Sequence, residues 1–126
     1  MTDALYQIEV QVSPRFLPAQ SEIEQSRFAF AYTVTITNHG ELPVQLLTRH
    51  WIITDGDGKT QEVRGEGVIG EQPTLAPNEQ FTYTSGTLMT SQVGNMHGSY
   101  RMQASDGHQF DAVIPPFLLA VPGALH

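Results

Sequence analysis

The sequence predicts an all-β protein, an antiparallel β-sandwich of the immunoglobulin-like or fibronectin type III-like kind with about seven strands. Apolar and polar side chains alternate strictly in several segments, which is the pattern of strands with one buried face. Residues that favour turns separate these segments at short intervals. No stretch has the periodicity of a long amphipathic helix, and the best helical candidate is the short segment 22–27.

The alternation is most regular in the first third of the chain. In residues 6–12, and again in residues 28–37, every second side chain is apolar or aromatic. Trp51 lies on the third expected strand, where a tryptophan commonly fills the core of a sandwich, so we expect it to be buried. The later strands are expected at residues 44–54, 60–64, 81–84, 100–104 and 109–114.

The composition fits one domain that spans residues 1–126. The formal net charge is -7 and the 6 basic residues are scattered, which argues against nucleic acid or a membrane surface as a partner. Because the chain has no cysteine, disulfides and thiolate metal sites are excluded. There is no signal-peptide pattern and no apolar run long enough to cross a bilayer, so a cytoplasmic location is expected.

Several segments carry a family resemblance. They are residues 49–55, 65–73, 81–86, 94–102 and 114–117. Together, and in this order, they resemble the ApaG family. The resemblance implies a fibronectin type III-like sandwich in a small bacterial protein, with a link to cobalt and magnesium resistance and to genes for diadenosine tetraphosphate hydrolysis. Related domains are appended to eukaryotic F-box proteins and to a polymerase-delta-interacting protein, which implies a protein-binding module by analogy.

The glycine motif of residues 65–70 matches the string G-x-G-x-x-G. A dinucleotide site needs that string between a strand and a helix, and the following Glu-Gln-Pro does not begin a helix, so we exclude such a site. Two interpretations remain open. The glycines permit a bulge or a tight loop, or their amides form a small nest for an anion, with Arg64 adding positive charge.

No pattern predicts a metal site, a cofactor or a catalytic residue. The segment 55–59 resembles the start of a calcium loop, but Lys59 and Thr60 stand where an oxygen ligand and a glycine are needed. No serine or carboxylate pair is placed by the sequence for catalysis, so the protein is not expected to be an enzyme. The histidines also lack the spacing of metal ligands; they are His39, His50, His97, His108 and His126.

The favoured interpretation is a noncatalytic binding module for an unidentified protein partner, with its contacts on loops at one end of the sandwich. The alternative is binding of a small anion or nucleotide, a phosphate-bearing molecule of the pyrophosphate type, at the glycine loop. Residues 89–98 are expected to be an adaptable loop beside it. The candidate contact residues are Arg64, Gly65, Gly67, Gly70, Met96 and His97.

The apolar segment 115–119 contains two prolines, so it is not expected to continue as a central strand. Two uses of this segment are left open. It packs across a sheet face, or it offers an edge to a partner or to a second copy of the chain in a homodimer.

Overall fold

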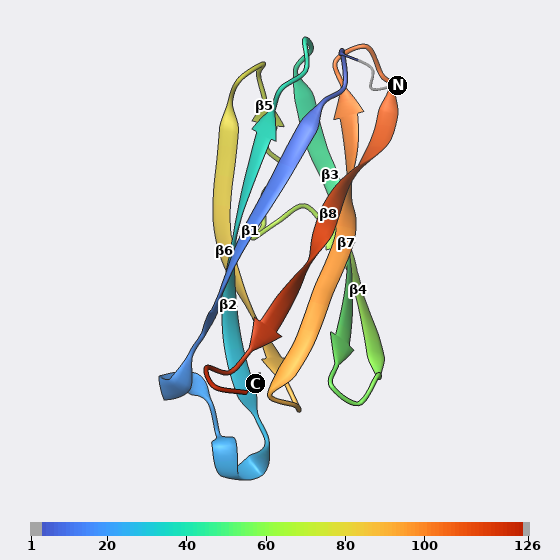
Figure 1. Ribbon diagram of the computed structural model, residues 1–126. Helices are drawn as coiled ribbons and strands as arrows, with labels where there is room; N and C mark the ends of the chain where they lie inside the picture. The colour runs from blue at the N-terminus through green and yellow to red at the C-terminus, as the bar shows by residue number, and fades with distance from the viewer. Residues whose placement is uncertain (1–3, 125–126) are drawn as a thin grey trace.

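The computed structural model describes residues 4–124, which form two antiparallel sheets packed face to face (Figure 1). The all-β sandwich predicted from the sequence is confirmed. The described strands are β1 (Ile8–Phe16), β2 (Phe28–Asn38), β3 (Val44–Asp55), β4 (Thr60–Glu66), β5 (Thr74–Leu75), β6 (Gln80–Met89), β7 (Val93–Ala104) and β8 (Gln109–Ala120).

The strand order leaves the two sides of the sandwich different. One sheet has the order β1-β2-β6, and the other has the order β4-β3-β7-β8, with the short β5 paired to β3 on the same side as β4. This arrangement of three and four long strands is that of fibronectin type III-like domains. On one side β1 lies against β8, whereas on the other side the edges of β4 and β6 have no further strand beside them among the described residues.

The alternation predicted for β2 holds in the middle of the strand. Val34 and Ile36 are fully buried between the sheets. Thr33 and Thr35 face the other way, and their hydroxyls bond across the strand pair to Thr84 at 2.9 Å and to Thr82 at 3.3 Å. The expectation that the whole second row faces solvent is wrong, because Ala29, Ala31 and Thr37 are buried as well.

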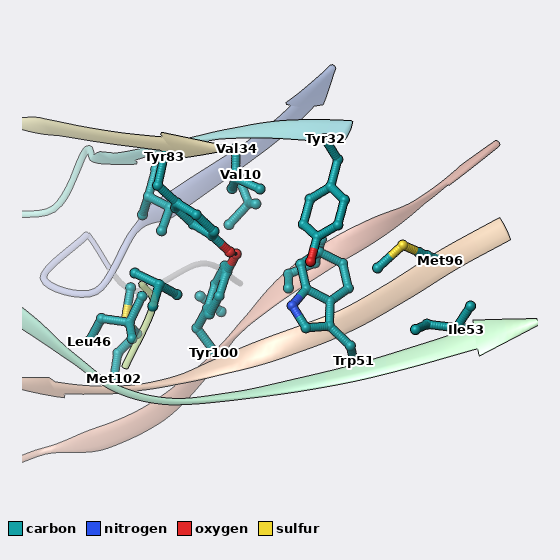
Figure 2. Packing of buried hydrophobic residues seen from close by; sticks show 14 of the residues in the cluster. Val10, Tyr32, Val34, Leu46, Trp51, Ile53, Tyr83, Met96, Tyr100 and Met102 are labelled. Carbon is teal, nitrogen blue, oxygen red and sulfur yellow. The ribbon is translucent and has the colours of Figure 1, made fainter. Parts of the chain in front are cut away.

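Trp51 is buried, as predicted, with 2% of its surface exposed. Its ring meets Tyr32 at a centroid distance of 5.2 Å and Phe117 at 5.9 Å, both edge to face. Figure 2 shows Trp51 reaching from one sheet towards Tyr32 of the other, with Met96 beside them. Aromatic side chains from both sheets thus hold the middle of the core together.

The hydroxyls of Tyr83 and Tyr100 are hydrogen-bonded to each other in the core, where Figure 2 shows the two side chains meeting. Burial raises the pKa of Tyr83 from about 10 to about 12, and burial likewise raises the pKa of Tyr100.

This pair predicts a loss of stability in alkali. Between pH 10 and about 12 the unfolded chain loses its tyrosine protons while Tyr83 in the folded chain keeps its own, so the free energy of unfolding falls as pH rises. Urea titrations across this range measure the effect. The double variant Tyr83→Phe, Tyr100→Phe removes both hydroxyls together and should show a clearly flatter decline. An equal decline in both proteins would contradict the assignment.

Two local expectations need correction. Residues 89–98 are not a loop throughout, because β7 begins at Val93 and carries Met96 and His97 as strand residues. The segment 22–27 forms only a short 3-10 turn at Ile23–Gln25. The expectation for the two prolines is confirmed, because β8 runs through them as an edge strand and its pairing with β7 shifts between Met96 and Gly98.

Candidate functional site

A groove runs along the side of the sandwich where the two free edges face each other. Its middle hollow has a volume of about 470 Å³. A hollow of about 190 Å³ and another of about 300 Å³ share lining residues with it, one at each end. We refer to these three hollows as the β4–β6 groove. The residues that define it best are Tyr32, Arg49, Trp51, Val63, Ser85 and Leu88.

The floor of the groove is apolar and belongs to the core. Tyr32, Trp51 and Met96 line it from below, although each is almost completely buried. Leu88 borders the hollow on β6, but it alternates with Thr87 and Met89, so its side chain, which is 63% exposed, lies on the outward face. An open hollow with an aromatic floor and polar groups around it is a place where side chains of a partner can be received.

The two strands that form the walls are very different edges. β4 carries the charged residues Glu62, Arg64 and Glu66, and charges on an edge strand are a common protection against pairing with another chain. β6 is ten residues long and contains neither a charged residue nor a proline. Its outer row of backbone N–H and C=O groups is therefore available to an added strand.

Arg49 stands at one end of the groove, and sequence reasoning missed it. It lies on β3 two residues before Trp51, so both side chains point to the inner face. Its Nη1 donates to the carbonyl oxygens of Glu66 at 3.0 Å and Gly67 at 2.9 Å. The guanidinium passes directly over Gly65, where an added Cβ would lie only 2.7 Å from it. The absence of a side chain at Gly65 thus leaves room for the Arg49 guanidinium.

No carboxylate of the described residues pairs with the guanidinium of Arg49. The side chain is partly buried, and it forms no ion pair within residues 4–124. Nη1 is the only one of its nitrogens for which the described residues supply a hydrogen-bond acceptor. A partly buried cation of this kind has remaining donors for an anionic ligand.

The glycine motif closes the same end of the groove as a tight turn. The amide of Val68 donates to the Glu71 carbonyl at 2.8 Å, and the Glu71 amide donates back at 2.9 Å. Gly67 has a φ of 62°, and a Cβ there would overlap the Glu71 carbonyl oxygen. Its amide is also used, because it donates to the Leu47 carbonyl at 2.9 Å. The fold itself therefore requires Gly67, without any ligand.

At the tip of this turn, Ile69 has a left-handed backbone with a φ of 44°. This conformation is unfavourable for a β-branched side chain, and the side chain is also 57% exposed. Replacing Ile69 with asparagine is therefore expected to raise the free energy of unfolding by about 1 kcal/mol. Urea denaturation measures the change. A lower stability of Ile69→Asn would show that apolar contacts of Ile69 outweigh the strain.

The structure divides the residues singled out from the sequence between two surfaces. Met96 lies in the floor of the groove, Gly65 lies beside the Arg49 guanidinium, and Gly67 and Gly70 belong to the turn that carries Val68 and Ile69. Arg64 and His97 face the outer side of the larger sheet instead, because they alternate with inward-facing neighbours.

Arg64 lies close to polar side chains on that outer surface. Its guanidinium lies 3.7 Å from Glu62, whose carboxylate also accepts a hydrogen bond of 2.8 Å from the His50 ring. The hydrogen bond from His50, more than any other contact, holds the pKa of Glu62 below its usual range. Arg64 is therefore separated from the glycine turn that it was expected to assist.

Among residues 4–124, no three His, Asp or Glu side chains lie close enough together to hold a metal ion. His126, one of the histidines considered above, lies outside the described residues. Within the described part of the chain, no helix has the length and apolar character needed to cross a membrane.

Comparisons with known proteins agree with the resemblance seen in the sequence. A family model described as the ApaG domain matches residues 18–104. A Pseudomonas aeruginosa protein named ApaG is 67% identical over 126 residues, covering 100% of both chains. A crystal structure of the ApaA protein from Bordetella pertussis matches with a TM-score of 0.91 at 50% identity, covering 94% of this chain and 96% of that chain. The family model and a full-length relative both match, and the chain therefore belongs to the ApaG family.

Proposed function

We propose that this protein is a noncatalytic binding module that takes up an extended segment of a partner protein along the free edge of β6. The observation that carries the proposal is the combination of a long, uncharged edge strand with a hollow beside it that has Trp51 in its floor. Backbone groups of β6 would supply hydrogen bonds, and the groove floor would accept side chains of the partner.

The geometry favours a strand over a compact ligand. The groove follows β6 from Tyr83 to its end at Met89, which is a length suited to several extended residues. Successive side chains of an added strand would point alternately towards Trp51 and towards solvent. The groove would then contact only every second side chain of the partner segment. Its specificity would depend on those side chains alone, so a short sequence motif would be sufficient for binding.

The added strand is expected to run antiparallel to β6. All strand pairs in the described chain are antiparallel, and β2 already pairs with β6 in this way over its length. Of the two edges that face the groove, β4 is the worse template because its charged side chains protect it.

The alternative of anion binding at the glycine turn stays a prediction. The amides of Gly67, Val68 and Glu71 already donate within the chain, which leaves fewer donors than a phosphate nest uses. Titration with millimolar pyrophosphate tests it, and shifts of the Ile69 and Gly70 amide resonances would support it. The link with cobalt and magnesium resistance likewise stays a prediction that rests on the family resemblance.

The proposed function is tested with a synthetic library of randomised octapeptides. Peptides retained by the immobilised full-length protein are identified by mass spectrometry and titrated singly into ¹⁵N-labelled protein. The amide resonances of Ser85, Gly86, Thr87 and Leu88 are expected to shift together. Failure to retain any peptide, or shifts confined to the outer face around Arg64, would contradict the proposal.

Two lysine substitutions on β6 provide a matched pair. Thr87 faces the groove, so Thr87→Lys places a charge in the path of the added strand and should weaken binding by at least roughly tenfold. Thr84 lies on the same strand but faces outward, so Thr84→Lys should bind nearly as well as the unchanged protein. Sedimentation velocity supplies a further check, because a dimer formed through β6 would mean that a second copy occupies the edge.

A further inference from the structure

We infer that the groove recognises the free carboxyl terminus of the partner segment, with the terminal carboxylate paired to Arg49. This inference rests on the proposed function, because it specifies which end of the bound segment lies at the closed end of the groove. The last residues of the segment would place an apolar side chain over Trp51 and the carboxylate beside the guanidinium.

The chemistry of the closed end favours a carboxylate. Arg49 lines both hollows at this end, and no described carboxylate lines either of them. Its Nη1 is fixed by two loop carbonyls, which holds the guanidinium plane in one place and leaves its other N–H groups for a ligand. A positioned guanidinium matches the two oxygens of a carboxylate, and partial burial strengthens the pairing.

An added strand that runs antiparallel to β6 has its carboxyl terminus beside Arg49. The closed end of the groove lies beside Tyr83 and Ser85, which come early in β6, and the open end lies beside Leu88 to Thr90. A strand antiparallel to β6 therefore begins at the open end and finishes beside Arg49. A parallel strand would instead bring a positively charged amino terminus to the guanidinium, which is unfavourable.

The turn at Val68 and Ile69 explains why a chain end is preferred to an acidic side chain. Both residues line the hollow that holds Arg49, and Val68 is anchored in the core with 1% of its surface exposed. A segment that continued past Arg49 would have to displace this turn. A segment that ends beside Arg49 does not have to displace the turn, and its terminal carboxylate lies next to the guanidinium.

The test uses three forms of each octapeptide selected by the protein. One form has a free carboxyl terminus, the second has a carboxamide in its place, and the third is a carboxamide with Asp as its last residue. The free acid is expected to bind at least about tenfold more tightly than the carboxamide, since one charge-assisted pair is lost. It is also expected to shift the Nε resonance of Arg49, whereas the carboxamide is not.

Variants separate the charge of Arg49 from its structural role. Arg49→Gln should bind the free acid and the carboxamide equally, and Arg49→Lys should retain part of the difference between them. Arg101→Gln, on the outer face beside Asp111, removes a cation of the same type and should leave the difference unchanged. Because Arg49→Gln also loses hydrogen bonds to the turn, the Arg49 Nε shift in the unchanged protein is the measurement that does not depend on that variant folding.

The outcomes distinguish this inference from the proposed function. If the free acid and the carboxamide bind equally well and both shift the β6 resonances, binding along β6 is confirmed and the proposed role of Arg49 is contradicted. If the form with the terminal Asp side chain binds as tightly as the free acid, the carboxylate source is a side chain and the inference fails. If no form binds, the proposed function fails, and this inference fails with it.

Discussion

Replacing Trp51 with alanine is expected to lower the free energy of unfolding by about 4 kcal/mol, as is usual for a large aromatic side chain in a core. Trp51 is 2% exposed and touches Tyr32, Tyr100 and Phe117 across both sheets. The surrounding rings belong to strands paired over most of their length, so they have little freedom to collapse into the space. Urea denaturation followed by circular dichroism measures the change.

The control for this change is Trp51→Phe, which keeps an aromatic ring and should cost clearly less, about 2 kcal/mol. Peptide binding should fall in Trp51→Ala even under conditions where the variant remains folded, because the ring is also part of the groove floor. A loss below about 1 kcal/mol in Trp51→Ala would mean that the ring does not hold the sheets together.

Replacing Gly98 with alanine is expected to destabilise the protein by about 3 kcal/mol or to prevent folding. Gly98 lies on β7 between two neighbours, opposite Trp51 on β3 and Ile114 on β8. An added Cβ would overlap the carbonyl oxygen of His50, which is backbone of the central strand β3. Because neither strand can move away without breaking its ladder, the strain falls on the main pairing of the larger sheet.

The matched control is Gly86→Ala on the edge strand β6. There the nearest atom to an added Cβ is the Phe30 carbonyl oxygen at 3.3 Å, a contact that a small shift of an edge strand relieves. Gly86→Ala should therefore change the stability by less than about 1 kcal/mol. Equal stability of Gly98→Ala and Gly86→Ala in urea would contradict the close approach of β7 to β3.

The sequence predicts the sandwich well because its information is local. The buried apolar row of β2 and the burial of Trp51 follow from the geometry of single strands, and both agree with the structure. The segments that begin β7 and end β6 were missed because Gly, Ser, Thr and Asn dominate them. Pairing with β3 and β2, rather than their own propensity, makes these segments strands.

The groove could not be predicted in the same way, because it depends on which strands are edges. The residues of β6 do not indicate that one of its edges stays unpaired. That β6 is an edge strand follows only from the order of strands in both sheets. The best available signal for Arg49 was its position two residues before Trp51 on a strand whose inner face is otherwise apolar. The glycine motif attracted attention instead, although Gly65 and Gly67 are explained by Arg49 and by the turn.

The central claim is that a partner segment becomes a new strand beside β6. Nuclear Overhauser contacts between a bound octapeptide and the labelled protein test it most directly. Backbone contacts are expected from the peptide to Ser85–Leu88 in an antiparallel register, with the last peptide residue near Arg49. Contacts to the outer face of the larger sheet, or to β8 with none to β6, would contradict it.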